Sequence, residues 1–238
     1  MEKTETIIPF VQSETNTKTF RNDYPVSEEL KEVMLTKVFK DFTRFALERY
    51  YPEYLPILTE YLHEHEIRGD NRESLLHNLF WWRIFYDSSM GFQSSCIEDF
   101  IVENYSWLSK RPILISWLKE CGKAIPKFYF VGYKYNDRVL VVMDTLEEKP
   151  LNIIVYDPLA IPPIKGEIVM GTILPLGNGL FFPISDFYHF DYQAREEIAH
   201  HLHYYYDLHM KTSPINEAFI HVLSAMLQIE KLVFLENQ

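Results

Sequence analysis

The fold of this chain is decided by residues 127–154, KFYFVGYKYNDRVLVVMDTLEEKPLNII, where aromatic and β-branched residues crowd together. Such residues favour strands, and Asn136-Asp137 is a plausible two-residue turn between two of them. A proline-rich connection begins at residue 158, and further strand-like runs follow it up to residue 184. Five short strands with tight turns predict a small antiparallel β barrel of SH3-like or OB-like type, because closure removes exposed sheet edges.

Helical patterns lie on both sides of this unit and predict an α+β chain in four parts. We expect a flexible arm, either mobile or laid along the surface, then a helical region, the barrel, and C-terminal helices that pack on the rest. Their residues are 1–24, 25–125, 126–187 and 188–238. Ser27 is a good N-cap for the first helix, because its hydroxyl can accept a hydrogen bond from a free backbone N–H of the first turn.

The charge balance argues against a nucleic-acid ligand. The 238 residues hold 23 Lys and Arg against 34 Asp and Glu, a formal net charge of -11, and no region is basic. Because nucleic-acid binding relies on a basic surface, we expect no direct binding to DNA. Cys96 and Cys121 lie inside helical patterns, which is typical of buried thiols in a reducing compartment. With no apolar segment of signal-peptide or membrane-span length, we expect a cytoplasmic protein without membrane contact.

A polar stripe on the predicted helix near residue 200 is the strongest candidate metal site. It consists of Glu196, His200, His203 and Asp207. Their spacing of four, three and four places them on one side of a helix, where carboxylate and imidazole groups can share a metal ion. The opposite side carries Ala194, Ile198, Leu202 and Tyr205. We therefore interpret the stripe as a solvated face, since a catalytic metal needs an enclosed and supported pocket.

Aromatic residues on the first strand form a candidate binding face. Strand alternation places Phe128 and Phe130 on one face, and Tyr129, Tyr133 and Tyr135 on the other. One of these faces packs in the core. The other is either a seam against the helices or a stacking platform for single-stranded nucleic acid, and the missing basic groove favours the seam.

The last helix is amphipathic and is a second candidate. Its apolar side either packs internally, which we consider the simpler interpretation, or binds the groove of a partner. The candidate partner-binding residues from both elements are Phe219, Val222, Met226, Tyr129 and Tyr133.

Three stretches carry a resemblance to a known family. They are 82–87 (WRIFYD), 142–146 (VMDTL) and 166–177 (GEIVMGTILPLG). Together they resemble the body of a poorly characterised bacterial family that often carries a C-terminal SEC-C zinc motif. The resemblance covers residues 75–200 and implies a helical region followed by a small β barrel, with little about activity. The SEC-C motif needs a cluster of Cys and His near the C-terminus, but the last 50 residues contain no Cys.

The sequence favours a binding protein over an enzyme. It has no His-Glu-x-x-His, no Gly-x-Ser-x-Gly, no phosphate-cradling glycine loop and no Cys-x-x-Cys. We expect a non-enzymatic binding or regulatory protein of a bacterial cytoplasm, without a cofactor, that acts through a protein or ribonucleoprotein partner. One alternative is an acidic mimic of nucleic acid that inhibits another protein, and another is a metal-assisted hydrolase that uses the helix at 196–207. The oligomeric state does not follow from the sequence.

Overall fold

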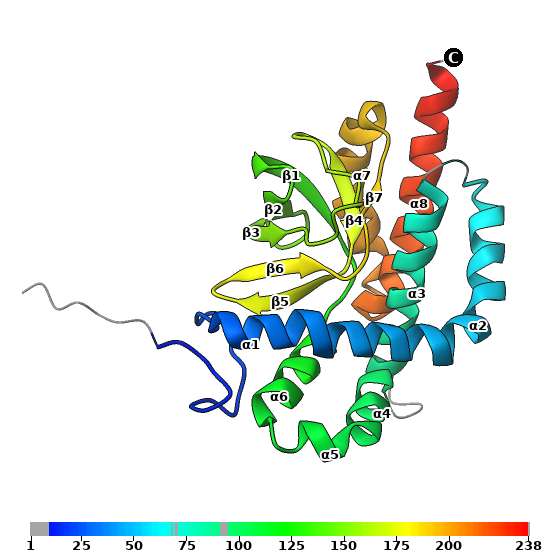
Figure 1. Ribbon diagram of the computed structural model, residues 1–238. Coiled ribbons are helices and arrows are strands. Elements are labelled where there is room, and N and C mark those ends of the chain that lie inside the picture. The colour runs from blue at the N-terminus through cyan, green and yellow to red at the C-terminus, as the bar shows by residue number, and fades with distance from the viewer. Residues whose placement is uncertain (1–9, 68, 70, 91–94, 238) are drawn as a thin grey trace, which may run out of the picture.

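The computed structural model describes residues 10–67, 69, 71–90 and 95–237 (Figure 1). A long helical segment crosses the molecule, with a curled sheet above it and shorter helices below it, and the C-terminal helices stand beside the sheet. The predicted α+β class, with helices before and after the β region, is confirmed.

The long segment is one continuous helical run from residue 28 to residue 64. It comprises α1 (Glu28–Glu32), the π-helix η1 (Val33–Phe39) and α2 (Lys40–Glu64). Ser27 caps this run as predicted, since its side chain accepts a hydrogen bond of 3.2 Å from the Leu30 backbone N–H. Pro52 and Pro56 lie inside α2, and Figure 1 shows this helix changing direction. Proline explains the bend, because it removes a backbone hydrogen bond and crowds the preceding turn.

The rest of the helical region is held by α2 and the sheet. Its helices are α3 (Asn71–Met90), α4 (Cys96–Glu103), α5 (Tyr105–Leu108) and α6 (Pro112–Cys121). Of these, α3 and α4 pack on α2, and α6 packs on α4 and on the strand β5 (Ile173–Gly177). Ser95 and Glu98 form a capping box at the start of α4, which satisfies two backbone donors reciprocally. The predicted burial of both thiols is confirmed, since Cys96 and Cys121 are free and buried.

The β region is a single curled sheet with seven strands in the described residues. They are β1 (Lys127–Asn136), β2 (Val139–Asp144), β3 (Lys149–Ile154), β4 (Ile168–Gly171), β5 (Ile173–Gly177), β6 (Leu180–Pro183) and β7 (Tyr188–His189). Their order is β5-β6-β3-β2-β1-β4-β7, with β3 and β6 parallel and the other neighbours antiparallel. The predicted five-stranded antiparallel barrel is therefore wrong, and the sheet is a mixed half-barrel.

A break at Thr172 divides one predicted strand between two parts of the sheet. The sequence predicts one strand over 167–176, but β4 ends before Thr172 and pairs with β1 and β7. β5 begins after Thr172 and pairs with β6. The two pieces therefore lie towards opposite ends of the sheet, and the edge strands β5 and β7 remain apart.

A bulge in β1 corrects the predicted assignment of its faces. Gly132 is an extra residue in this strand, because the β2 partners of Val131 and Tyr133 are adjacent in sequence. A one-residue slip moves the following side chains to the other face of a sheet. Tyr133 therefore leaves the face of Tyr129 and joins that of Phe130.

The two faces of the sheet pack into separate hydrophobic cores. The larger core joins one face to the helices and contains, among others, Phe42, Trp117, Phe128, Phe182 and Phe219. The smaller core fills the opposite face and contains Tyr129, Val131, Leu140, Val142, Ile153 and Phe187, with further aliphatic side chains. Burial on both faces explains why β4 and β5 are apolar throughout rather than alternating.

The described part of the N-terminal arm, from Phe10 onward, is laid along the surface, and residues 1–9 lie outside the described residues. Phe20 is buried. The side-chain amide of Gln12, which is also buried, donates a hydrogen bond to the Arg21 carbonyl and accepts one from the Arg21 N–H. Gly177 has a φ of +96°, and a Cβ at this position would lie 2.3 Å from Val26 Cγ2. The arm thus docks where only glycine leaves room.

The C-terminal helices pack on one face of the sheet, where Tyr206 and Phe219 contact Phe128. The segment comprises the short η2 (Tyr192–Ala194), α7 (Arg195–His209) and α8 (Ile215–Glu236). By length and composition, α8 is the one helix among the described residues that could cross a membrane, which was not expected from the sequence. One side of α8 nevertheless lies in the larger core, where Phe219 and Val222 are buried.

Candidate functional site

Most of the predicted partner-binding residues lie in the cores. Four of them have an exposed fraction of 1% or less: Phe219, Val222, Met226 and Tyr129. The Phe219 ring packs 5.8 Å from that of Phe128, so α8 uses this side to cover the sheet. The apolar side of α8 thus packs internally, which was the simpler interpretation of this helix. Tyr133 is 53% exposed and remains available to a partner.

The polar stripe of α7 faces away from the core. Glu196, His200, His203 and Asp207 are all exposed. The buried side carries Ile198, Leu202 and Tyr206, with Tyr206 in the place expected for Tyr205. Among the described residues, no group of three or more His, Cys, Asp or Glu side chains is placed to hold a metal ion. The metal-assisted hydrolase therefore gains no support from the arrangement of the helix.

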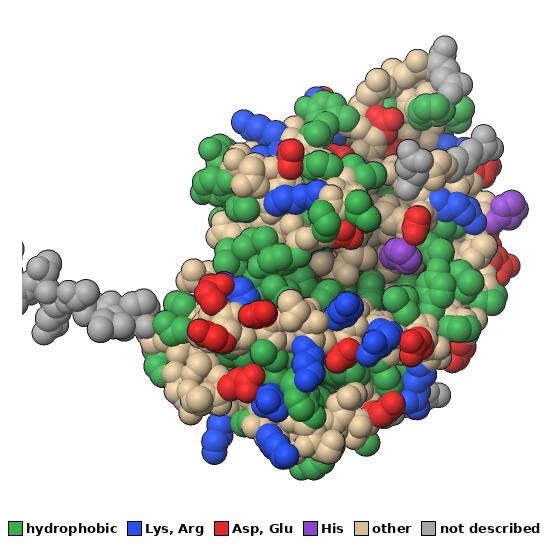
Figure 2. Space-filling model, viewed as in Figure 1, with side chains coloured by type: hydrophobic (Ala, Val, Ile, Leu, Met, Phe, Trp, Pro, Cys, Tyr) green, Lys and Arg blue, Asp and Glu red, His purple; other side chains and the backbone are tan. Residues whose placement is uncertain are grey.

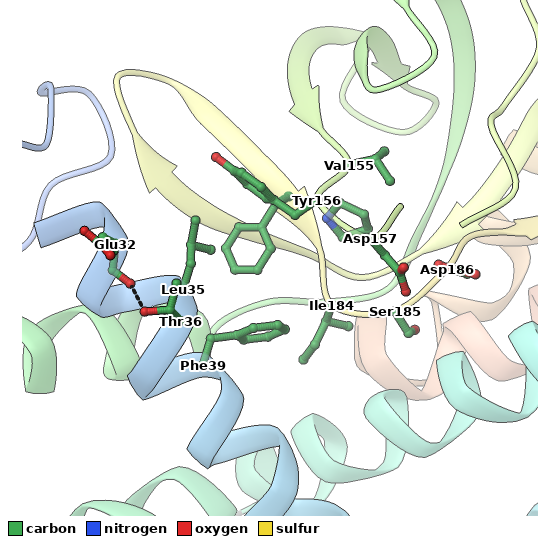
Figure 3. A pocket seen from close by; sticks show the side chains of 12 residues that line it. Glu32, Leu35, Thr36, Phe39, Val155, Tyr156, Asp157, Ile184, Ser185 and Asp186 are labelled. Carbon is green, nitrogen blue, oxygen red and sulfur yellow. Dashed lines mark hydrogen bonds between the residues drawn. The ribbon is translucent and has the colours of Figure 1, made fainter. Parts of the chain in front are cut away.

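A cavity of about 450 Å³ lies where the long N-terminal helix meets the ends of two strands (Figure 3). Its walls come from η1 with the preceding Glu32, from residues 155–157 after β3, and from residues 182–186 at the end of β6. We call it the acidic cavity. The surface in Figure 2 is hollowed between the sheet and the long helix. η1 is wound as a π-helix, a rare form that occurs most often at functional sites.

The walls of the acidic cavity are largely apolar. The aromatic side chains are Phe39, Tyr156 and Phe182, and aliphatic side chains include Leu35, Val155 and Ile184. Phe182 is buried, whereas Tyr156 is 46% exposed at the edge. A ligand in this cavity would therefore cover hydrophobic surface that water now contacts.

Three carboxylates, those of Glu32, Asp157 and Asp186, border this apolar space, and none of the described lining residues is a Lys or Arg. Asp157 Oδ1 accepts a hydrogen bond of 2.8 Å from the Leu159 backbone N–H. Within the described residues, the Asp186 carboxylate makes no hydrogen bond or ion pair. Burial raises the pKa of Asp186, and the negative charge of Asp157 raises it further, against smaller opposing effects of nearby cationic groups. The two aspartates therefore make one end of the cavity negative, partly offset by the charge of Arg138.

The loops that carry the two aspartates are held by side chains outside the cavity. Arg138 donates hydrogen bonds of 2.6 Å to the carbonyl oxygens of Asp157 and Pro158, and one of 3.2 Å to that of Ala160. The buried Asn78 of α3 donates a hydrogen bond of 2.7 Å to the Asp186 carbonyl. Both aspartates are thus fixed through their backbones, and the Asp186 carboxylate has no hydrogen-bond partner among the described residues.

The cavity has no arrangement suited to nucleophilic catalysis in the described residues. The Ser185 hydroxyl is buried and lacks a hydrogen-bond partner there, so no base is placed to activate it. What the cavity can do is bind: its shape and charge suit a cationic group carried on an apolar body.

A second cavity of about 750 Å³ lies between the end of α2, β7 and the C-terminal half of α8. Its buried carboxylate, Glu230, accepts hydrogen bonds from the Tyr188 hydroxyl (2.7 Å) and the Asp191 backbone N–H (2.6 Å). Lys231 pairs with Glu66 at 2.9 Å. Burial raises the pKa of Glu230, and these two hydrogen bonds act in the opposite direction.

Charged side chains on the visible face are mixed rather than segregated. Figure 2 shows Asp and Glu interspersed with Lys and Arg and with exposed hydrophobic groups. Rows of carboxylates resembling a phosphate backbone do not stand out on this face. The acidic mimic of nucleic acid therefore stays a prediction.

Comparison with known proteins found no match: no family model, no curated protein and no solved structure is similar to this chain at a significant level. The resemblance to the body of the SEC-C family also stays a prediction.

The residues of the acidic cavity were not singled out by their sequence pattern. They come from three segments centred near residues 36, 156 and 184. The nearest signal was the proline-rich connection at 158–166, which predicts a loop but not its neighbours. Local sequence patterns cannot show which distant segments meet in the fold, so they did not predict this site.

Proposed function

We propose that the protein is a non-enzymatic binding protein that receives a basic side chain of a protein partner in the acidic cavity. The observation that carries this proposal is the pairing of an apolar cavity with three carboxylates and no cation among the described lining residues. A lysine or arginine side chain fits this chemistry, because its methylene stem covers apolar surface while its charge remains near the acidic end. A regulatory role in a bacterial cytoplasm is part of this proposal.

The partner bound in this way is a protein rather than nucleic acid. The formal net charge of -11 repels phosphate groups and favours basic segments. The exposed Tyr133 ring, packed 5.0 Å from Tyr135, offers additional aromatic area to such a partner.

A random heptapeptide library panned on the immobilised protein tests this function. Counter-selection uses the double variant Asp157→Asn/Asp186→Asn, and a second double variant, Glu48→Gln/Glu60→Gln, removes two exposed carboxylates of α2 as the matched control. We expect enriched peptides with Lys or Arg beside apolar residues, which bind the cavity double variant at least about tenfold more weakly, or ~1.4 kcal/mol. Peptides that bind both double variants equally, or that lack basic residues, overturn the proposal.

A further inference from the structure

The loop between β3 and β4 is rich in proline. Residues 158–165 read PLAIPPIK, and residues 161–164 belong to no helix or strand. Proline fixes φ at about −65°, and the residue before a proline is restricted to extended conformations. Ile161 and Pro162 each precede a proline, so this stretch favours the polyproline II conformation. We call residues 158–165 the proline loop.

Burial along the proline loop repeats every three residues. Ala160 and Pro163 are buried, and Ala160 lies in the smaller core. The side chains before, between and after them are exposed: Pro158, Leu159, Ile161, Pro162, Ile164 and Lys165. A polyproline II helix has about three residues per turn, so side chains three apart form a ridge. One ridge of the loop therefore lies on the protein, and the other two face outward.

The proline loop is held in place at both ends. Arg138 donates a hydrogen bond of 2.6 Å to the Pro158 carbonyl near its start. Near its end, the Ile164 N–H donates one of 2.8 Å to Oε2 of the buried Glu167. The other carboxylate oxygen of Glu167 lies 2.8 Å from His189 Nδ1 in β7. Because the loop is already ordered, a partner that binds it pays little conformational entropy for the loop.

The two outward ridges are apolar and carry one cation. Exposed fractions are 89% for Leu159, 50% for Ile161 and 49% for Ile164. Lys165 is exposed and makes no ion pair within the described residues. In the same part of the chain, the carbonyl oxygens of Ile161 and Pro162 accept no hydrogen bond. Such a surface is complementary to a groove whose rings cover the ridges, whose Tyr O–H and Trp N–H groups donate to the carbonyls, and whose carboxylate pairs with the lysine.

We propose that the proline loop docks into the aromatic-lined groove of a partner protein, with Lys165 against a carboxylate at one end of that groove. This inference goes beyond the proposed function, because residues 158–165 do not line the acidic cavity. It gives the protein a second surface for a partner of a different kind.

The backbone of the proline loop favours such a groove over a β-strand of the partner. A strand that adds to an edge needs both donors and acceptors along the backbone it meets. Pro162 and Pro163 have no N–H, and the Ile164 N–H is already bonded to Glu167. A groove that offers only donors to the backbone has no such requirement, since carbonyl oxygens are what the loop presents.

A phage-displayed library of WW domains with randomised loops, selected on the immobilised full chain, tests the inference. WW domains bind polyproline II segments in a groove lined with aromatic rings. We expect enriched domains that a free proline-rich decapeptide displaces, because the peptide occupies the same groove. No enrichment, or enriched domains that the decapeptide does not displace, overturns the inference.

A pair of double variants locates the contact on the chain. Ile161→Ser/Ile164→Ser removes the apolar side chains of one outward ridge, and we expect the enriched domains to bind at least about tenfold more weakly, or ~1.4 kcal/mol. Leu232→Ser/Leu235→Ser on α8 is the matched control, because these side chains are 59% and 56% exposed. Thermal melts verify that both proteins are folded. Equal binding of the two double variants overturns the inference.

A single substitution tests the role of charge. Lys165→Gln should weaken binding severalfold and make it less sensitive to salt, because the ion pair with the groove is lost. Lys110→Gln is the matched control, since Lys110 is exposed and lies on another part of the chain. If the two substitutions have the same effect, the groove does not pair with Lys165 and the proposed orientation is wrong.

The outcomes distinguish this inference from the proposed function. Basic heptapeptides selected for the acidic cavity should bind Ile161→Ser/Ile164→Ser as tightly as the original chain. If the enriched WW domains instead lose affinity for Asp186→Asn and keep it for the loop variant, they bind the acidic cavity. That result overturns the docking of the loop and leaves the proposed function standing.

Discussion

The acidic cavity and the second cavity are both formed where helices meet strand ends, but they treat their carboxylates differently. In the second cavity, Glu230 accepts two hydrogen bonds and Glu66 is paired with Lys231. In the acidic cavity, the Asp186 carboxylate has no hydrogen-bond or ion-pair partner among the described residues. Buried charges that are satisfied contribute to the fold, whereas a partly buried charge without a partner costs stability unless a ligand compensates it.

This difference separates a structural role from a binding role. The satisfied groups of the second cavity connect α8 to β7 and to the end of α2. The acidic cavity instead carries Asp157 and Asp186 on loops whose backbones are held by Arg138 and Asn78. Substitutions in the second cavity should therefore lower mainly the free energy of unfolding, whereas substitutions in the acidic cavity should weaken mainly cation binding.

The largest expected effect on stability is that of Glu230→Ala. Removing the carboxylate leaves the Tyr188 hydroxyl and the Asp191 N–H without their acceptor, at a cost of about 2–3 kcal/mol. Chemical denaturation measures this loss. Glu230→Gln is the control, since its side chain can still bond to both groups and should retain most of the stability. Loss of cation binding in a folded Glu230→Ala protein would contradict the separation of the two cavities.

Arg138→Ala should have an intermediate effect and act on both properties. It removes three hydrogen bonds to loop carbonyls, and we expect a loss of about 1–2 kcal/mol in the free energy of unfolding. Because the loop carries Asp157, cation affinity should also fall severalfold. Arg195→Ala is the comparison, since Arg195 bonds to the Tyr192 carbonyl far along the chain. If the two variants bind cations equally well, Arg138 does not position the site.

Cation binding should weaken as the pH falls. Protonation of the aspartates removes the charge that attracts the ligand, and the raised pKa of Asp186 moves the onset above the ordinary aspartate pKa of about 3.9. Affinity of a basic peptide enriched from the library, measured between pH 7 and pH 4, reports this dependence. The Asp186→Asn variant should bind more weakly at pH 7 and show a shallower pH profile. An unchanged profile in this variant would assign the titration to another group.

The smallest expected effect is on the stability of Asp186→Asn without ligand. A carboxyl whose pKa is higher in the folded than in the unfolded state stabilises the fold at low pH, and this contribution is lost as the pH rises through the folded-state pKa. The asparagine variant should thus melt slightly higher at pH 7, by no more than about 2–4 °C, and the difference should vanish below pH 4. Thermal melts at both pH values test this. A lower melting temperature at pH 7 would indicate that Asp186 has a structural partner.

Local patterns predicted the secondary structure of this chain well where one residue type decides it. Ser27 caps the first helix, and the strand residues of 127–154 form β1, β2 and β3. The prediction failed where pairing with another strand decides the local structure. Gly132 is compatible with either an even strand or a bulge, and only its pairing with β2 selects the bulge that turns Tyr133 outward.

The sequence by itself determined the α+β class, the helix caps, the burial of both cysteines and the acidic charge, because these follow from composition and from contacts within a few residues. Tertiary structure alone decided that β3 and β6 pair in parallel, that β5 and β7 remain separate edges, and that α8 uses its apolar side internally. It also decided the acidic cavity, since Phe39, Tyr156 and Asp186 are far apart along the chain. The physical reason is that long-range packing chooses among local structures of nearly equal free energy.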